Sequence, residues 1–282
     1  MKRGRSNFRH DKPRDGERRL PQTRPSEPRR ERTETNSGTI FGVLPVLEAL
    51  RSNSRRIEKI IVADGARIHR LSEIFDLARE HRIIVDRVGG DRLDRIVGAE
   101  QNHQGVVAFA AAADYLDTDE ILDAIEGEAL LVLLDGVEDP RNLGAILRTC
   151  ECAGANGVFI PERRAVGLTD TVAKSSAGAV EHIKVAKVTN LNRLIDDLKS
   201  RNIWVVGTSG EAEMSYNDWD WTQPSALVMG SEGSGLHRLV AENCDALVKI
   251  PMYGKIESLN VSVAAGVVLF EARRQREQKG SE

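Results

Sequence analysis

Apolar residues in the C-terminal half of the chain come in short runs that alternate with amphipathic stretches. The runs are as long as β-strands and lie at 130–134, 157–160, 203–206, 226–229 and 246–250. Apolar positions with helical periodicity lie between or after these runs, at 143–153, 191–201 and about 260–275. Short apolar strands that alternate with helices predict a parallel sheet covered by helices on both faces. We therefore expect an α/β domain over residues 129–282.

Residues 38–113 predict a second and smaller α/β unit. The apolar residues between Ile40 and Leu50 favour a helix, and those between Leu71 and Ala78 recur at helical spacing. Strands are expected at 57–63, 83–85 and 106–109. The junction between the two domains is expected at 114–128, where an acidic segment around 121–125 favours a short helix.

The first 37 residues differ in composition from the rest of the chain. They are rich in Arg, Pro and Glu and almost lack aliphatic residues, so they cannot bury enough surface to offset the entropy of ordering. Residues 1–35 hold 12 Lys or Arg against 6 Asp or Glu, a charge of +6, which leaves −9 for the remaining chain. A disordered basic tail on an acidic body suggests contact with a polyanion, and a solvated tail without a partner explains the same composition.

Composition also argues against several classes of protein. No run of 18 apolar residues predicts a transmembrane helix, and no apolar segment follows the charged N-terminus as in a secretory signal. Cys150, Cys152 and Cys244 are too few and wrongly spaced for a disulfide framework or a four-ligand zinc site. We expect a cytoplasmic protein that has no membrane contact and binds no metal.

Polar residues collect in three segments, and each segment directly follows a predicted strand. The first, 135–148, runs into a helix for which Asn142 is a candidate N-cap. The apolar stripe of this helix consists of Leu143, Ile146, Leu147 and Cys150. Arg148 lies within the same helix, where periodicity alone favours an ordinary surface residue.

The other two segments, 228–236 and 250–262, repeat this design. Three glycines in the first let the backbone approach a ligand closely, and a tight turn would explain them equally well. Ser258 and Asn260 stand near the start of the last helix, where capping alone would account for both. In a parallel sheet, however, ligands bind beyond the carboxyl ends of the strands. We therefore expect the three segments to offer their polar residues to one region.

In this order, the three segments resemble the signature motifs of the SpoU/TrmH family of RNA 2′-O-ribose methyltransferases, within the SPOUT superfamily. Motif one matches at Asp139, Pro140, Asn142, Gly144, Ile146 and Arg148. Motif two matches within 229–236, and motif three at 250–252 and 258–262. Residues 46–50, 103–106, 174–179 and 207–210 also resemble segments of this family. The likeness thus covers nearly everything except the tail.

The resemblance implies a fold, an oligomeric state and a cofactor. Residues 129–282 would form a trefoil-knotted SPOUT domain, residues 38–113 an L30e-like substrate-binding domain, and the protein a homodimer. The knot does not follow from periodicity, and general rules of topology argue against one. The cofactor would be S-adenosylmethionine, and the resemblance implies that it is held by Thr208, Gly230, Ile250 and Leu259, largely through backbone groups.

The resemblance assigns catalysis to Asn142, Arg148, Glu232, Ser258 and Asn260. Arg148 would act on the ribose hydroxyl, either as proton acceptor or as a cation that stabilises a phosphate or an alkoxide. Deprotonating an arginine at pH 7 costs roughly 8 kcal/mol because its pKa lies far above neutral pH, so the second role is physically easier. Asn142 would hold Arg148, Glu232 would anchor the second turn or bind RNA, and Ser258 and Asn260 would line the same pocket.

The implied activity is 2′-O-methylation of a guanosine in 23S ribosomal RNA, a substrate that the presence of an N-terminal domain favours within the family. Transfer-RNA ribose methylation is the alternative enzymatic function. A noncatalytic RNA-binding factor for ribosome assembly is the alternative of another class, and the intact motif residues argue against it.

Some polar and aromatic residues outside the motifs carry weaker signals. Trp219 and Trp221, with Tyr216, could stack on RNA bases, but packing at the sheet edge is the favoured interpretation. Cys150 and Cys152 are expected to be buried or half-buried. His103 is expected to be structural, in the turn before the strand at 106–109.

Removal of residues 1–35 should weaken RNA binding by about 3- to 10-fold at low salt, because a basic tail adds phosphate contacts that salt screens. The measurement is the Kd for 23S ribosomal RNA transcribed in vitro, for the full and the shortened chain, at low and high salt. Equal affinities at low salt would show that the tail is only solvated.

Overall fold

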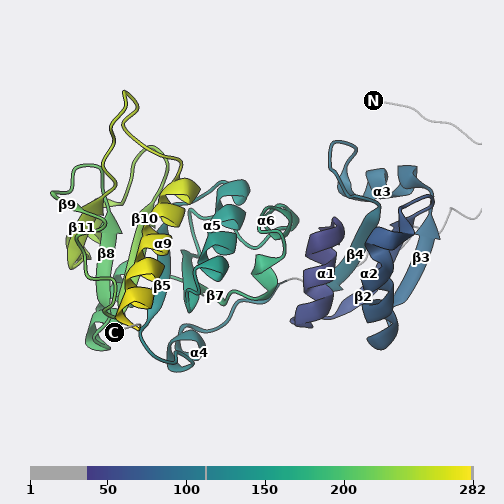
Figure 1. Ribbon diagram of the computed structural model, residues 1–282, viewed down its shortest axis with the longest axis horizontal. Coiled ribbons are helices and arrows are strands. Elements are labelled where there is room, and N and C mark those ends of the chain that lie inside the picture. Colours follow the sequence, from purple (N-terminus) through teal and green to yellow (C-terminus); the bar gives the residue numbers. More distant parts are fainter. Residues whose placement is uncertain (1–36, 112, 281–282) are drawn as a thin grey trace, which may run out of the picture. The chain divides into compact units, whose positions relative to one another are not determined.

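A seven-stranded sheet organises the C-terminal part of the chain (Figure 1). The computed structural model describes residues 37–111 and 113–280. The sheet order is β7-β6-β5-β10-β8-β11-β9, and all neighbouring strands are parallel. The strands are β5 (Leu130–Asp135), β6 (Gly157–Pro161), β7 (Val185–Val188), β8 (Trp204–Thr208), β9 (Met214–Ser215), β10 (Ser225–Gly230) and β11 (Ala246–Lys249). The predicted parallel sheet is confirmed; β7 and β9, both short, were not predicted.

Helices cover both faces of this sheet, as the sequence predicts. One face carries α5 (Pro140–Cys152), α6 (Asp170–Ser175) and α9 (Val261–Lys279), and the other α4 (Thr118–Asp123), α7 (Leu191–Ser200) and α8 (Arg238–Asn243). A single-turn 3-10 helix, Ala179–Glu181, follows α6. In β5, Leu130, Val132 and Leu134 pack toward the first face and Leu131 and Leu133 toward the second, all fully buried. This burial on both sides explains why the strand is a continuous apolar run.

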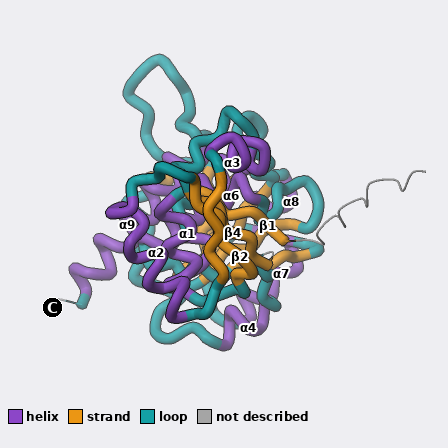
Figure 2. Tube along the Cα trace, turned by 90° about the vertical axis from the view of Figure 1, so that its right-hand side faces the viewer, coloured by secondary structure: helices purple, strands orange, loops and turns teal. Residues whose placement is uncertain are grey.

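A four-stranded sheet of order β1-β4-β2-β3 organises residues 37–111. Its strands are β1 (Ser37–Phe41), β2 (Ile57–Ala63), β3 (Ile84–Val88) and β4 (Val106–Ala111). Helices α1 (Val43–Ser52) and α2 (Ile68–Glu80) lie together on one face (Figure 2), and α3 (Gly90–Val97) packs on the other. The strands predicted in this region and the helix at 71–78 are confirmed, and α3 was not predicted.

The helix predicted to begin at Ile40 is wrong in its first residues. Ile40 and Phe41 belong to β1, which pairs antiparallel with β4. Their side chains point to opposite faces, Ile40 into the core under α1 and α2 and Phe41 into the core under α3. A short apolar run fits a strand and a helix equally well, and the tertiary pairing decided between them.

The predicted junction at 114–128 contains the helix α4, which starts three residues before the expected segment. A capping box fixes its start: the backbone N of Asp117 donates to Glu120 Oε2 at 2.9 Å. Ile121 is fully buried in the core of the large sheet. The division into domains at 38–113 and 129–282 stays a prediction, and the predicted basic tail at 1–37 lies, but for Ser37, outside the described residues.

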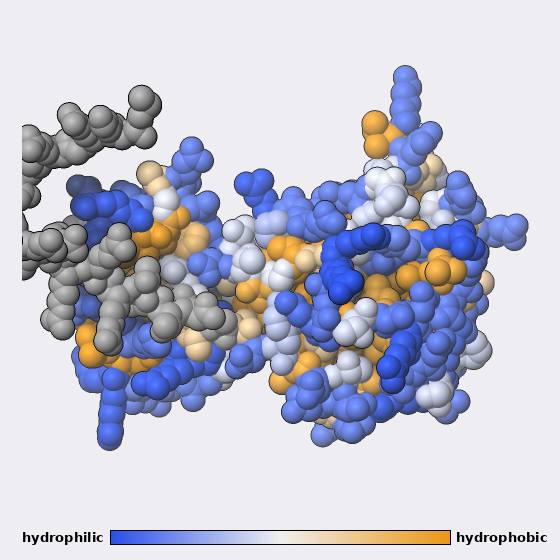
Figure 3. All heavy atoms as spheres, turned by 180° about the vertical axis from the view of Figure 1, so that it is seen from behind, coloured by the Kyte–Doolittle hydropathy of each residue, from blue (hydrophilic) through white to orange (hydrophobic). Residues whose placement is uncertain are grey.

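None of the described helices combines the length and apolar character that a bilayer crossing requires. Hydrophilic side chains cover most of the face seen in Figure 3, interrupted by small apolar areas. Buried apolar clusters lie between the large sheet and the helices on both of its faces, and their burial stabilises the fold.

Leu133→Ala should lower the free energy of unfolding by about 2–5 kcal/mol, because it removes a fully buried side chain from the interior strand β5. Leu239→Ala is the matched control: that leucine is 57% exposed, so the change should stay within about 0.5 kcal/mol. Chemical denaturation of both variants tests this, and a Leu133→Ala protein as stable as the control would contradict the burial of β5 between the two helical layers.

Candidate active site

Thr208, Gly230 and Ile250 stand at the carboxyl ends of three adjacent strands. Thr208 ends β8, Gly230 ends β10, and Ile250 directly follows β11, with β8 in the middle of the three. The Thr208 hydroxyl donates to the Val228 carbonyl oxygen at 3.2 Å, which ties β8 to β10 at this edge. The sheet therefore brings these strand ends together in one region, as the sequence predicts.

Gly230 is required by the turn that follows it. The Ser231 N donates to the Gly235 carbonyl oxygen at 3.0 Å, and the Gly235 N donates back to the Ser231 carbonyl oxygen at 3.0 Å. The turn thus closes against the end of β10. A Cβ on Gly230 would lie 2.2 Å from the Gly235 carbonyl carbon, so no larger residue fits.

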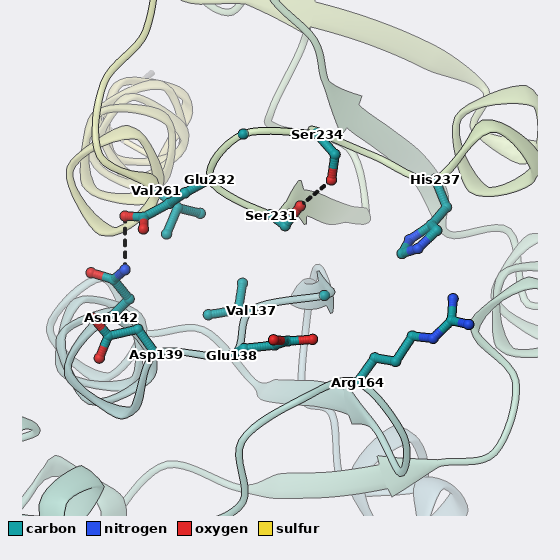
Figure 4. A pocket seen from close by; sticks show the side chains of 12 residues that line it. Val137, Glu138, Asp139, Asn142, Arg164, Ser231, Glu232, Ser234, His237 and Val261 are labelled. Carbon is teal, nitrogen blue, oxygen red and sulfur yellow. Dashed lines mark hydrogen bonds between the residues drawn. The ribbon is translucent and has the colours of Figure 1, made fainter.

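Asn142, Glu232 and Asn260 form one hydrogen-bond network that joins the three motif segments. The Asn142 Nδ2 donates to Glu232 Oε1 at 2.7 Å (Figure 4), and the Asn260 Nδ2 donates to the same oxygen. The Asn260 Nδ2 also donates to Asn142 Oδ1 at 3.0 Å. A carboxylate that accepts from two amides makes charge-assisted hydrogen bonds, which are stronger than neutral ones.

The expected N-cap role of Asn142 is wrong. Helix α5 starts three residues earlier: Asp139 is its N-cap, Asp139 Oδ1 accepts from the Arg141 N at 2.7 Å, and Pro140 occupies the first helical position. Proline favours that position because its fixed φ suits a helix and its missing N–H is not needed there. Asn142 is thereby freed for Glu232, and it is only 9% exposed.

Asn260 is the N-cap of α9, as its position predicts. Its Oδ1 accepts from the Ser262 N at 2.9 Å, while its Nδ2 enters the network. Capping and the network therefore use opposite ends of one amide. Ser258 and Leu259 precede it in the exposed loop that extends from β11 (Figure 1), and Ser258 bonds to no described residue.

Arg148 does not join this network. It lies six residues beyond Asn142 in α5, which is about 9 Å along the helix axis and about 120° around it. Its side chain is exposed and forms no hydrogen bond or ion pair within residues 37–111 and 113–280. The structure thus brings Asn142, Glu232 and Asn260 together and leaves Arg148 facing solvent.

A cavity of about 400 Å³ adjoins the network and shows residues that sequence reasoning missed. Asn142 and Glu232 line one end (Figure 4), while Arg164 and His237 line the other and Glu138 lies between. Glu138, Arg164 and His237 each lie in a segment that follows a strand, which is the same signal that located the motifs. Only their side-chain directions, which sequence does not show, distinguish them from ordinary loop residues.

The weaker candidates behave mostly as structural residues. Trp221 is fully buried and its Nε1 donates to the Tyr216 carbonyl oxygen at 2.7 Å, so the packing interpretation holds for it. His103 accepts from the Gly105 N at 3.0 Å, which confirms its structural role. Cys150 is buried, as expected, whereas Cys152 is exposed, because it lies beside the exposed Glu151 on the solvent-facing side of α5.

The cysteines and the possible metal ligands of the described residues do not form a reactive thiol site or a metal site. Burial raises the pKa of the Cys150 thiol, and burial raises the pKa of Cys244 to about 12, so both stay protonated at neutral pH. No group of three or more His, Cys, Asp or Glu residues in the described part of the chain is placed to hold a metal ion.

Comparisons with known families cover both sheets. Residues 129–270 match the model of the SpoU rRNA Methylase family, and residues 39–116 match the model named RNA 2′-O ribose methyltransferase substrate binding. The chain belongs to the SpoU methylase family. The recognition made from the three motifs is therefore confirmed, and so is the α/β fold with a mainly parallel sheet. The trefoil knot stays a prediction.

Similar proteins carry names within this family. The 23S rRNA (guanosine-2′-O-)-methyltransferase RlmB of Ralstonia nicotianae is 46% identical over 86% of this chain and 97% of its own length. The TrmH-family protein YacO of Bacillus subtilis, named for transfer or ribosomal RNA, is 45% identical over the same shares. The SpoU methyltransferase AviRb of Streptomyces viridochromogenes, solved in complex with AdoMet, has a TM-score of 0.74 and 27% identity over 89% of this chain and 94% of that one.

Glu232→Ala should loosen the start of α9, because Asn260 loses its charged acceptor while Glu232→Gln keeps an acceptor oxygen. Amide hydrogen exchange at 258–264 should become about fivefold faster in Glu232→Ala and change less in Glu232→Gln. If both variants exchange like the wild type, the network does not hold the third segment.

Proposed function

We propose that this chain transfers a methyl group from S-adenosylmethionine to the ribose 2′-oxygen of a guanosine in 23S ribosomal RNA. The observation that carries the proposal is the network of Asn142, Glu232 and Asn260, which joins the three family motifs in one place. The name of the Ralstonia nicotianae relative supports the substrate, and the AviRb complex supports the cofactor.

The cofactor would lie at the edge formed by Thr208, Gly230, Ile250 and Leu259. Within the described residues, no hydrogen bond occupies the backbone groups of Ile250 or Leu259, so they can recognise a ligand through main-chain atoms. The tight turn after Gly230 brings a further stretch of backbone to the same edge. When bound, S-adenosylmethionine supplies an electrophilic methyl group.

Asn142, Glu232 and Asn260 would position the ribose and the loops around it. Holding the attacking oxygen in line with the methyl group contributes a large part of such a reaction. Ser258, in the exposed loop, would contact the RNA. Arg148 would contribute its positive charge from the solvent-facing side of α5, where an RNA phosphate can reach it. This role avoids the roughly 8 kcal/mol needed to deprotonate an arginine.

The domain arrangement and the assembly belong to the same proposal. Residues 38–113 would bind RNA, which their match to the substrate-binding model supports. A homodimer is supported by Val263 and Phe270, large apolar side chains on α9 that are each 51% exposed and lie two turns apart on one face.

Transfer RNA is the alternative substrate, because the name of the Bacillus subtilis relative includes it. In a noncatalytic RNA-binding protein, the hydrogen bonds among Asn142, Glu232 and Asn260 would only stabilise the fold.

Mapping of ribose methylation across ribosomal and transfer RNA, in cells with and without this protein, tests the function directly. We expect one 23S guanosine to lose its methyl group in the deletion strain. The wild-type gene and an Arg141→Ala control, at another exposed position of α5, should restore it, whereas Arg148→Ala should reduce methylation about 10²- to 10³-fold in vitro. A lost mark in transfer RNA would select the alternative, and an unchanged pattern would refute the activity.

A further inference from the structure

The cavity beside the amide network has a second end with charges of both signs. Arg164 comes from the loop after β6, Glu138 from the loop after β5, and His237 precedes α8. Figure 4 shows the three side chains directed into this end, opposite Asn142 and Glu232. Among the described residues, Arg164 and Glu138 form no hydrogen bond or ion pair, so their hydrogen-bonding groups are available to a ligand.

The side chain of His237 lines this end and is held in place by hydrogen bonds. Its backbone N donates to Asp135 Oδ2 at 2.7 Å, and its ring Nδ1 lies 2.8 Å from Asp135 Oδ1. Asp135 is only 4% exposed at the end of β5. The ring also lies against Gly136, since a Cβ there would be 3.6 Å from His237 Cε1. Two-point attachment to a buried carboxylate holds the imidazole in place beside Arg164.

The balance of charge argues against a phosphate in this cavity. Three carboxylates line it, those of Glu138, Asp139 and Glu232, against the side chains of Arg164 and His237. A phosphate would be repelled by the carboxylates, whereas a neutral group that both donates and accepts hydrogen bonds suits them. The volume of about 400 Å³ lies within the range of small-ligand sites.

Guanine has this combination of donors and acceptors. Its O6 and N7 accept from the two-pronged guanidinium of an arginine, the commonest specific contact to this base. Its N1–H and N2–H groups donate, and a carboxylate accepts from them. Adenine places an amino donor beside N7 and so cannot accept both hydrogen bonds from an arginine.

We propose that Arg164 and Glu138 read the base of the methylated guanosine, Arg164 at O6 and N7 and Glu138 at N1–H and N2–H. This inference rests on the proposed function and adds to it the residues that select the base. The ribose would then lie toward Asn142 and Glu232, at the opposite end of the cavity.

The test uses the full-length protein and a 23S ribosomal RNA fragment that contains the mapped guanosine. That guanosine is replaced by 7-deazaguanosine, which lacks the N7 acceptor, or by inosine, which lacks the N2 amino group. For the wild type, kcat/KM should fall about 10-fold with each analogue. For Arg164→Gly, kcat/KM for guanosine should be reduced and should equal that for 7-deazaguanosine. For Glu138→Ala, kcat/KM for guanosine should be reduced and should equal that for inosine.

Two variants of the same loop serve as controls. Arg163→Ala should keep the wild-type ratio between guanosine and 7-deazaguanosine, because Arg163 lines a neighbouring cavity and not this one. Arg164→Lys keeps the charge but loses the planar fork, so it should lose most of the discrimination. Arg164 has a φ of 56°, so the glycine variant relieves backbone strain and should fold normally.

The outcomes separate this inference from the proposed function. Wild-type enzyme that methylates guanosine and both analogues equally would overturn the base contacts and leave the methyltransferase activity intact. A second outcome concerns Arg164→Gly. If this variant lowers kcat/KM for guanosine and for 7-deazaguanosine by the same factor, and RNA binding depends less on salt, then Arg164 contacts a phosphate and the assignment is overturned. Absence of any ribose methylation by the wild type would overturn both proposals.

Discussion

One oxygen of Glu232 accepts hydrogen bonds from two asparagines that are 118 residues apart in the chain. Asn142 stands in the first turn of α5, and Asn260 caps α9, so this carboxylate links the starts of two helices to the turn after β10. Three loops that would otherwise move independently are thereby fixed relative to one another. The arrangement of polar groups at this edge of the sheet depends on that shared acceptor.

The parallel sheet makes the shared acceptor possible. Because all neighbouring strands run the same way, the loops after β5, β10 and β11 leave from one edge, although long stretches of sequence separate them. The end of β5 supports both ends of the cavity: Asp135 holds His237, and Asp139 starts α5 so that Asn142 points to Glu232. The buried leucines of β5 therefore stabilise the site as well as the core.

Charge is distributed unevenly around this edge. The network supplies a carboxylate and two amides, the far end of the cavity supplies Arg164 and His237, and Arg148 stays outside in solvent. Arg148, to which we assign an electrostatic role, thus lies on a different surface of α5 from Asn142. An exposed arginine keeps its charge easily, which favours an electrostatic role over proton abstraction.

The sequence by itself determined the parallel strands, the helices on both faces and the three motif segments, because these follow from local periodicity and residue type. It placed Asn260 as a cap correctly, since capping is decided within four residues. It placed the N-cap at Asn142 instead of Asp139, although Asp139 followed by Pro140 is itself a local signal for the start of α5. It also assigned Ile40 and Phe41 to a helix, because a short apolar run cannot show which strand it will pair with. The three-way contact at Glu232 and the direction of Arg164 were decided only in the folded chain, where residues distant in sequence come within hydrogen-bonding distance or line one cavity.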